Sequence, residues 1–522
     1  MYWLRDGMNV LVVGVVVLFL GVAVCERQKE FTAAVYEHAV ILPQGSKDGV
    51  VSRRDALKTI MTNIDIYSAQ AKMAALKRVD ILVFPEGGLF GWDFDRNTIT
   101  PYLEHVPVTK QGEWNPCTHP GTYPDSKIQH HLSCMARNNS LYIVGNLGNK
   151  IECDENADGY CPDGGQYQYN TAVVFDRNGD LVASYNKRNL NNEPQYDYPQ
   201  KAELVSFNTP FGLFGLYFCD EIYHYDPAMR MIDELGIPNV VCPTSWRDSY
   251  PNGIAIQTLS GFARGFGINM LAANVHRPDM GKQGSGIYSP DGVVASYYDN
   301  RSGSSGKLLV ATTGVIRRPV RQRLPQYETS MQAEGGSQDT FMSDVNGDSY
   351  KLVILDSRQR SLRLCVAEMC CEIEYDIEFR SGDVYAFGVF SGNHAQPKNG
   401  KYNYYQSCMV LKCPNSTQES CGKQSTDASS VFTHLRINAF FSTNYIYPLH
   451  VASRRGQLIL LSEWNYQDGV LWSRQRTYPL VSAGFYGRIY ERDSSNSQTI
   501  CASVALLISC VYYALNSCSF YN

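Results

Sequence analysis

The first 300 residues of the chain alternate between two hydrophobic patterns. Segment 52–79 (SRRDALKTIMTNIDIYSAQAKMAALKRV) has apolar residues at helical spacing, whereas segments 36–43 (YEHAVILP) and 80–86 (DILVFPE) are short, continuous apolar runs. Runs of this length with turn signals at their ends are typical of buried strands, and apolar residues three or four apart are typical of a helix with one buried face. The alternation predicts mixed sheets covered by helices.

This pattern continues to about residue 314 and then changes. Asn178-Gly179 and Asp291-Gly292 each separate two apolar runs, which is a strong signal for a hairpin. Beyond residue 315 the helical signal fades, and short alternating segments such as 383–392 (DVYAFGVFSG) dominate. We expect an α/β domain over residues 31–314, a polar connector over 315–344 and a β-rich domain over 345–492.

Both ends of the chain carry an apolar stretch. At the N-terminus, Arg5 precedes the run 10–24, and the small residues Ala23 and Cys25 have the spacing that signal peptidase accepts. We expect a cleaved signal peptide over residues 1–25 rather than a membrane anchor, because a spanning helix needs about 20 apolar residues.

The C-terminal stretch resembles a glycolipid-anchor signal. Small polar residues at 494–497 precede the apolar run 500–515, so residues 494–522 fit a GPI-anchor signal, with a short membrane-spanning tail as the alternative. We expect the protein to be secreted or held on the extracellular face of the plasma membrane, touching the membrane only through this lipid anchor. Glycosylation sequons begin at Asn138, Asn300 and Asn415 and agree with export.

Composition and charge narrow the possible partners. Hydrophobic residues make up 44% of the chain and charged residues 19%, which is typical of a globular protein. The formal net charge of -5 provides no basic footprint, so a nucleic-acid partner is not expected.

The sixteen cysteines divide by position. Four fall in the predicted signal peptide and tail. Cys117 and Cys134 are close enough in sequence to pair, as are Cys153 and Cys161, and six more crowd between residues 365 and 421. These ten could form five bridges. Parity leaves two alternatives for the remaining pair, Cys219 and Cys242: both are free, or they are bonded to each other.

Three predicted strand ends carry residues suited to nucleophilic catalysis. Glu86 ends the run ILVFPE, Lys187 ends LVASYNK and Cys219 ends GLYFC. A thiol needs a base to become a thiolate, and the oxyanion that forms on attack needs a cation or N–H donors. Taken singly, each also has a structural explanation: a loop carboxylate, a solvated hairpin end and a buried or disulfide-bonded cysteine.

Together, these segments resemble the nitrilase (carbon-nitrogen hydrolase) superfamily, which uses Glu, Lys and Cys in this order. Within it, the chain is similar to the vanin and biotinidase branch. The N-terminal resemblance rests on FPEGGLFGW, YQYNTAVVFDRNGDLVASYNKRNL, FNTPFGLFGLYFC, PTSW, FGINMLAANVH and GSGIYSPDG. The C-terminal resemblance rests on RLCVAEMCC, QSCMVLKC and VFTHLRINAFFSTNYIYP.

The resemblance implies a fold and a mechanism. The fold is a nitrilase-like αββα sandwich followed by a smaller, disulfide-bearing β-rich domain. In the mechanism, Glu86 is the proton acceptor, Lys187 the proton donor and oxyanion stabiliser, and Cys219 the nucleophile that forms a thioester. The backbone N–H of Asp220 would support the oxyanion, and Glu193 would correspond to an additional glutamate near the lysine. No metal or organic cofactor is expected.

The resemblance also implies a substrate class, a small linear amide. Our first hypothesis is hydrolysis of pantetheine to pantothenate and cysteamine. A biotinidase, which cleaves biotin amides such as biocytin, is the alternative. From another class, the chain could be a catalytically silent surface glycoprotein.

The chain departs from this family beside the proposed nucleophile. Relatives usually have Cys-Phe-Asp, whereas this chain has Cys219-Asp220-Glu221. If the Asp220 side chain points toward the sulfur, like-charge repulsion disfavours both the thiolate and the oxyanion; if it points to solvent, the change is mild. Arg247, where relatives tend to carry an apolar residue, could change the pocket rim.

Overall fold

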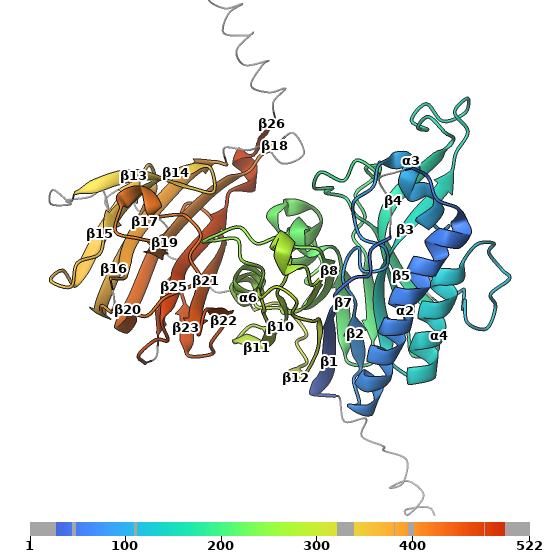
Figure 1. Ribbon diagram of the computed structural model, residues 1–522, viewed down its shortest axis with the longest axis horizontal. Helices are drawn as coiled ribbons and strands as arrows, with labels where there is room; N and C mark the ends of the chain where they lie inside the picture. Colours follow the sequence, from blue (N-terminus) through green and yellow to red (C-terminus); the bar gives the residue numbers. More distant parts are fainter. Residues whose placement is uncertain are drawn as a thin grey trace, which may run out of the picture.

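The computed structural model describes residues 28–43, 49–108, 112–320, 339–380, 382–394, 401–473 and 475–495. In its N-terminal part, two six-stranded sheets pack face to face, with helices on the outer faces (Figure 1). The first sheet has the order β12-β1-β2-β3-β4-β5 and the second β11-β10-β9-β8-β7-β6. The predicted αββα sandwich is therefore confirmed.

The strands of the first sheet are β1 (Glu30–Glu37), β2 (Ile81–Val83), β3 (Tyr142–Glu152), β4 (Gln166–Phe175), β5 (Leu181–Asn186) and β12 (Lys307–Gly314). Those of the second are β6 (Ser206–Thr209), β7 (Gly212–Leu216), β8 (Asn239–Thr244), β9 (Asn269–Asn274), β10 (Ser285–Ser289) and β11 (Gly292–Tyr297). The helices are α2 (Arg53–Leu76), α3 (Arg96–Ile99), α4 (Lys127–Asn139), α5 (Arg230–Asp233) and α6 (Ala255–Phe266).

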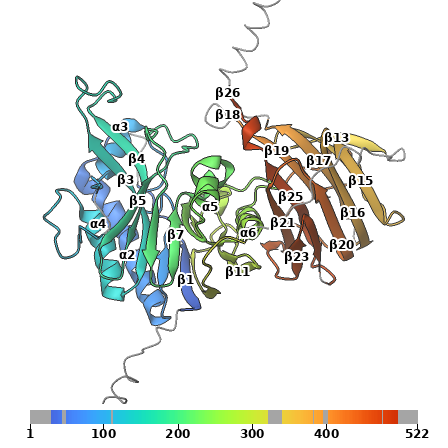
Figure 2. The ribbon, with the colours of Figure 1, turned by 180° about the vertical axis from the view of Figure 1, so that it is seen from behind.

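Helix α2 confirms the helical reading of segment 52–79. Its N-cap Ser52 accepts a hydrogen bond from the backbone N–H of Asp55, which satisfies one of the free donors of the first turn. Its buried apolar residues recur at three- and four-residue spacing: Ala56, Ile60, Ile64, Tyr67, Ala71 and Ala74. With α4, it covers the outer face of the first sheet (Figure 2).

Strand β1 lies earlier than segment 36–43. It pairs with β12 over Glu30–Glu37 and with β2 over Ala33–Val35, so its partners fix its position. After Glu37 the chain leaves the sheet, and the side chain of Asn63 binds the backbone N–H and C=O of Ile41. Both predicted hairpins are confirmed: β4 pairs with β5, and β10 with β11.

The C-terminal part is built from strands, as expected. A seven-stranded sheet, β13-β14-β17-β19-β25-β21-β22, faces a five-stranded sheet, β15-β16-β20-β24-β23, and β18 pairs with β26 (Figure 1). The predicted connector boundaries stay predictions, because residues 321–338 lie outside the described ranges. The bounds are β13 (Thr340–Val345), β14 (Asp348–Ile354), β15 (Ser361–Val366), β16 (Met369–Glu378), β17 (Val384–Asn393), β18 (Lys401–Tyr402), β19 (Tyr404–Cys413), β20 (Val431–Phe440), β21 (Tyr445–Arg454), β22 (Gln457–Ile459), β23 (Trp464–Gln467), β24 (Val470–Ser473), β25 (Leu480–Arg488) and β26 (Ser494–Ser495).

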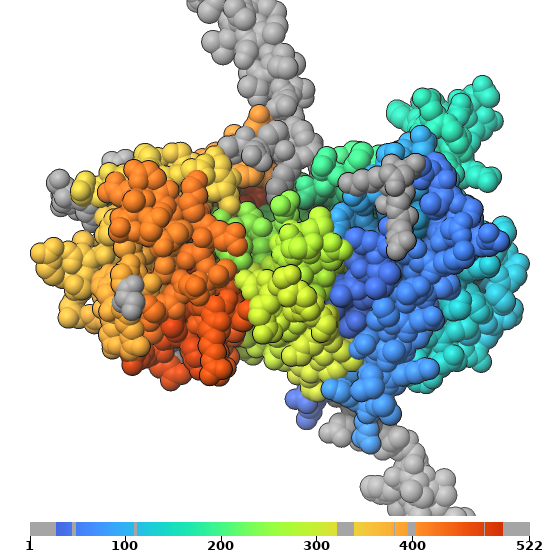
Figure 3. Space-filling view, viewed as in Figure 1, coloured from blue at the N-terminus to red at the C-terminus, as the bar shows by residue number. Residues whose placement is uncertain are grey.

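The two parts pack closely along helix α6, which lies against strand β21 (Figure 3). Gly265 allows this approach, because a Cβ there would lie 2.6 Å from the backbone oxygen of Ile446. Polar contacts cross the same boundary. Gln257 Nε2 donates to Ser482 Oγ at 2.9 Å, and the buried Arg488 donates through Nε to the backbone oxygen of Tyr223 at 2.9 Å. The C-terminal part therefore braces the segment that follows Cys219.

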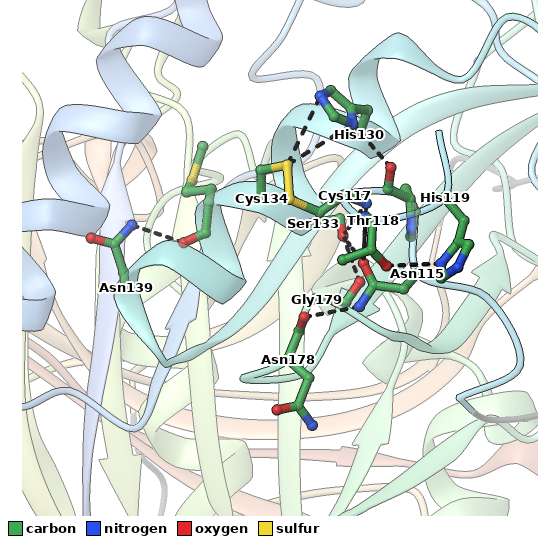
Figure 4. Close-up of a disulfide and its surroundings, with 12 residues drawn as sticks. Asn115, Cys117, Thr118, His119, His130, Ser133, Cys134, Asn139, Asn178 and Gly179 are labelled. Carbon is green, nitrogen blue, oxygen red and sulfur yellow. Dashed lines mark hydrogen bonds between the residues drawn. A yellow bond between two sulfur atoms is a disulfide. The ribbon is translucent and has the colours of Figure 1, made fainter. Parts of the chain in front are cut away.

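Six disulfides are present in the described residues. Cys117–Cys134 fastens a long loop to α4, where Ser133 also holds the β4–β5 turn by donating to the Gly179 oxygen (Figure 4). This pairing and Cys153–Cys161 confirm the sequence expectation. The crowded C-terminal cysteines pair as Cys365–Cys370, Cys371–Cys408 and Cys413–Cys421. The sixth bridge joins Cys219 to Cys242.

The features that predict export are the two chain ends and the sequons. The predicted signal peptide and all but the first two residues of the predicted anchor signal lie outside the described residues. Within the described ranges, no helix is long and apolar enough to span a membrane. Asn138 and Asn415 are exposed, whereas Asn300 is half-buried and accepts a hydrogen bond from Gln457. Glycosylation at these sites stays a prediction.

Candidate active site

Strand ends from both sheets meet at one cavity of about 380 Å³. Glu86 lies three residues beyond β2, Lys187 directly follows β5, and Cys219 lies three residues beyond β7 at the start of a short 3-10 helix, η2 (Cys219–Tyr223). Glu86, Lys187 and Asp220 line the cavity. Cys219 is fully buried immediately behind it and is not one of the lining residues.

Lys187 is the centre of this cluster. Its Nζ lies 2.8 Å from Glu86 Oε1, 2.7 Å from Glu193 Oε1 and 2.9 Å from Asp220 Oδ2. Burial by itself would lower the pKa of Lys187, but the three carboxyl groups, Asp220 foremost, raise that pKa well above its ordinary value. Glu193 is thus a partner of Lys187, which is held as a buried ammonium ion, and the correspondence of Glu193 to the family's additional glutamate stays a prediction.

Glu86 is held in the form that a proton acceptor needs. Oε1 accepts from Asn170 Nδ2 at 2.8 Å, and Oε2 accepts from the backbone N–H of Ser245 at 2.9 Å and its hydroxyl at 3.1 Å. Burial alone would raise the pKa of Glu86, but the charge of Lys187 and the hydrogen bonds hold it below its usual value. At neutral pH the group is therefore a carboxylate.

Sequence reasoning missed the polar residues that position these carboxylates. Asn170 of β4 donates to Glu193 Oε2 as well as to Glu86, each at 2.8 Å. Asn146 of β3 donates to Asn170 Oδ1 at 2.6 Å and accepts from the backbone N–H of Gly87. The available signal was weak: each is one of several amide side chains in its strand, and only its burial shows that it requires partners.

The structure resolves the orientation of Asp220. Its side chain points to Lys187, not to solvent. Burial, only partly offset by Lys187, raises the pKa of Asp220 to about 6. The resemblance assigns the Lys187 ammonium group to the oxyanion, and Asp220 already binds this group. The residue at which the chain departs from the family pattern therefore lies inside the site.

Glu221 has a positioning role that the sequence did not indicate. It is fully buried, and Oε1 accepts from Tyr185 Oη at 2.8 Å and from the backbone N–H groups of Arg188 and Asn189 at 3.0 and 2.9 Å. Oε2 accepts from the N–H of Phe218 at 3.1 Å. One side chain thus joins the segment after Lys187 to the turn that contains Cys219.

The even number of cysteines allowed Cys219 and Cys242 to be either free or bonded to each other, and the structure shows which of these holds. Cys219 and Cys242 are bonded, with their Cα atoms 5.0 Å apart. A sulfur in a disulfide cannot attack an amide carbonyl, because the nucleophile is the thiolate. The assignment of Cys219 as nucleophile therefore stays a prediction, and it applies to the reduced pair.

Two cations line the cavity besides Lys187. Lys282 Nζ lies 3.8 Å from the ring centroid of Trp92, and burial lowers the pKa of Lys282 to about 8, partly opposed by Glu86. Arg247 is exposed at the rim, as expected from its place after PTSW. Neither forms an ion pair with a residue in the described ranges. Both are available to a ligand.

A second polar chain has a structural role. His276 Nδ1 lies 2.7 Å from Glu37 Oε1, and Nε2 lies 2.9 Å from Ser304 Oγ. This order resembles a serine-type triad, but Ser304 donates its hydroxyl proton to the Arg301 oxygen, and Glu37 also accepts from Ser285. The chain of contacts ties β1 to β10 and to the loop before β12.

An αββα sandwich with Glu, Lys and Cys at neighbouring strand ends defines the class as an amide hydrolase of the nitrilase type. The comparisons with known sequences agree. A carbon-nitrogen hydrolase family model matches residues 52–297, and a Vanin C-terminal domain model matches residues 339–493. The chain belongs to the carbon-nitrogen hydrolase family, in its vanin and biotinidase branch, and is a hydrolase of carbon-nitrogen amide bonds.

The similar proteins span nearly the whole chain. A pantetheinase from Mus musculus is 38% identical over 92% of this chain and 93% of its own length. A biotinidase from Homo sapiens is 36% identical, covering 89% of this chain and 90% of its own. Among solved structures, an amidase from Nesterenkonia sp. is 20% identical over 55% of this chain and 92% of its own, with a TM-score of 0.39.

Proposed function

We propose that this chain, with Cys219 reduced, hydrolyses pantetheine to pantothenate and cysteamine. The observation that carries the proposal is the buried Glu86–Lys187 pair beside Cys219, at the strand ends where the family resemblance assigns base, cation and nucleophile. The similarity to pantetheinases over most of the chain supports this substrate.

The reaction follows from the protonation states at these atoms. Glu86 takes the thiol proton, and Cys219 Sγ attacks the amide carbonyl carbon. The charge that develops on the carbonyl oxygen is stabilised by Lys187 Nζ and by the backbone N–H of Asp220. The C–N bond breaks as Glu86 returns the proton to the departing amine, which leaves a thioester. Glu86 then activates water, and hydrolysis of the thioester releases the acid and restores the thiol.

A biotinidase activity is the second candidate, and the cavity wall favours it in one respect. Lys282 and Arg247 offer two cations without carboxylate partners in the described residues. Biocytin carries a carboxylate, whereas pantetheine carries none. An ammonium group that is largely shielded from water forms its strongest hydrogen bonds with a charged partner. An anionic substrate would therefore bind this wall more tightly than a neutral one.

For location, we propose the extracellular face of the plasma membrane. The predicted signal peptide, the predicted GPI-anchor signal and the exposed sequons at Asn138 and Asn415 support it. Release of the protein from cells by a phosphatidylinositol-specific phospholipase tests the anchor. Retention on the cells after that treatment favours the membrane-spanning tail.

The function is tested by amine release from pantetheine and from biocytin, measured side by side on the reduced full-length protein. We expect turnover of pantetheine and a loss of at least about 1,000-fold in Cys219→Ala, because the variant lacks the thiolate that forms the thioester. The matched control is Cys153→Ala with Cys161→Ala, which removes two cysteines far from the cavity. If neither amide is hydrolysed, the silent glycoprotein remains and the proposal fails.

A further inference from the structure

The chain places a second cysteine within bonding reach of the proposed nucleophile. Strands β7 and β8 are parallel neighbours, and Leu216 lies opposite Val241 in the register. Cys242 is therefore next to the segment that ends β7, and its Cα lies 5.0 Å from that of Cys219, inside the range over which a disulfide closes without backbone movement.

This pair differs from the other five bridges. None of the cysteines of those five bridges is close in sequence to a residue that lines the cavity, whereas Cys219 directly precedes the lining residue Asp220 and Cys242 lies two residues before the lining residue Thr244. Cys219 itself does not line the cavity. Closing the bridge removes the thiol and also keeps the sulfur behind the cavity wall.

The reduced pair has suitable surroundings as well. The backbone oxygen of Cys242 lies 2.9 Å from Cys219 Sγ and can accept a hydrogen bond from the thiol. On the cavity side, Lys187 pairs with Asp220, the residue that follows Cys219, so a cation and a carboxyl group lie next to the segment that carries the thiol. Both redox forms of the pair are thus compatible with one backbone.

We propose that Cys242 is a resolving thiol, and that Cys219 and Cys242 form a thiol–disulfide exchange site whose ligands are small diffusible thiols and disulfides. The inference rests on the proposed function of Cys219 as the hydrolytic nucleophile. The dithiol form hydrolyses amides and the bonded form does not. The cavity of about 380 Å³ limits the exchange partner to a small molecule.

The exchange balances in two steps. The Cys219 thiolate attacks one sulfur of a small disulfide RSSR, which gives a mixed disulfide at Cys219 and releases one RS⁻, protonated to RSH. The Cys242 thiolate then attacks the Cys219 sulfur, forms the internal disulfide and expels the second RS⁻. The small disulfide is reduced to two thiols and the cysteine pair is oxidised. Two equivalents of thiol reverse the reaction.

The test is a redox titration of the full-length protein with reduced and oxidised glutathione. At each ratio, amide hydrolysis is measured, and free thiols are alkylated before peptide mass mapping. We expect hydrolysis to fall by at least about 100-fold under oxidising conditions, because the nucleophile is consumed, and to return on reduction as Cys219 becomes alkylatable.

Two variants isolate the role of Cys242. Cys242→Ser and Cys242→Ala should accumulate a glutathione mixed disulfide on Cys219 in place of the internal bridge, and each should recover faster on reduction than the wild type. The double variant Cys153→Ser with Cys161→Ser should titrate like the wild type. If Cys219 of the oxidised wild type carries glutathione or stays alkylatable, Cys242 does not resolve and the proposal is overturned. Mass mapping reads this outcome even if the reduced protein hydrolyses no amide.

Discussion

At the scale of single residues, the site is defined by an excess of carboxyl groups over one ammonium. Lys187 Nζ lies 2.7–2.9 Å from carboxylate oxygens of Glu86, Glu193 and Asp220. Each carboxylate therefore competes with the others, and with any developing oxyanion, for this ammonium group. Glu86 is needed as the base, and Asn170 also holds Glu193. Asp220 is the member whose side chain has no role in the proposed mechanism.

The first prediction concerns Asp220→Asn. The pKa of Asp220 is about 6, so its charge appears as the pH rises through 6 and its hold on Lys187 strengthens. Above pH 6, we expect kcat/KM of the reduced wild type to become lower than that of the variant. The ratio of the two values should reach up to about tenfold, which corresponds to one pKa unit. Profiles of kcat/KM against pH measure this.

The control for that profile is Asp279→Asn, which removes a carboxylate that pairs with Arg277 and not with Lys187. Its profile should follow the wild type. Superimposable profiles for wild type and Asp220→Asn would show that Asp220 does not compete for the ammonium group.

The second prediction concerns Lys282→Met. This variant keeps the apolar stem against Trp92 and removes the unpaired charge. We expect KM for biocytin to rise by about tenfold or more, with a smaller rise for pantetheine, because a hydrogen bond to a charged group contributes about 1.5–3 kcal/mol. The pKa of Lys282 is about 8, so the wild-type KM for biocytin should also rise as the pH passes 8. Arg277→Met is the matched control, and an equal KM in both variants contradicts a role for Lys282 in binding.

At the scale of secondary-structure elements, the site forms where strands end. This explains which of its residues the sequence could predict. Glu86, Lys187 and Cys219 each end an apolar run, so pattern and family resemblance located all three. The disulfide partner of Cys219 depends on the parallel register of β7 and β8, which no local pattern encodes. For the same reason β1 lies earlier than segment 36–43, because its pairing with β12 sets its bounds.

The C-terminal sheet contributes one buried cation to the catalytic half. Arg488 of β25 is fully buried, binds the Tyr223 oxygen at 2.9 Å and pairs with Asp493 at 2.7 Å. Tyr223 ends the short helix that begins at Cys219 and lines the cavity. The β-rich part therefore supports the turn that presents the nucleophile.

The third prediction is that Arg488→Met lowers the free energy of unfolding by about 1–3 kcal/mol, because it leaves the half-buried carboxylate of Asp493 and the backbone oxygens of Tyr223 and Tyr404 without their donor. It should also reduce kcat. The measurement is the urea midpoint. The exposed Arg358→Met, whose partner Asp356 is at the surface, should leave the urea midpoint unchanged. If the two variants unfold alike, Arg488 does not brace the interface.

At the scale of the whole molecule, several buried carboxyl groups couple folding to pH. Burial is the largest cause in each case and raises the pKa of Asp220 to about 6 and those of Glu104, Glu221 and Asp248 to about 7. The unfolded chain ionises these groups near pH 4, so between pH 4 and 7 the folded state binds more protons. Their contribution to stability is complete below pH 4 and is lost as the pH rises through 7.

The fourth prediction follows from that sign. The melting temperature should fall between pH 5 and pH 7.5, by roughly 2–4 °C for each kcal/mol lost. Asp248→Asn should flatten the dependence, because an amide acquires no charge. Its Oδ1 can still accept from the N–H of Ala255, whereas its Nδ2 replaces the oxygen that accepts from Tyr298 and Gln283, so we expect a lower melting temperature at every pH. Calorimetry across this pH range measures both. A melting temperature that rises with pH for the wild type would contradict the assignment of raised pKa values.

The chain as a whole thus combines a nitrilase-type sandwich, a bracing β-rich part and a catalytic centre whose cysteine has a second cysteine in reach. The central claim is that Cys219, once reduced, carries the acyl group during amide hydrolysis. The most direct measurement is the intact mass of the reduced protein, quenched in acid during turnover of pantetheine. We expect a pantothenoyl thioester on Cys219 that is absent from Cys219→Ala. Hydrolysis that continues undiminished in Cys219→Ala, with no acyl group on the wild-type protein, would contradict it.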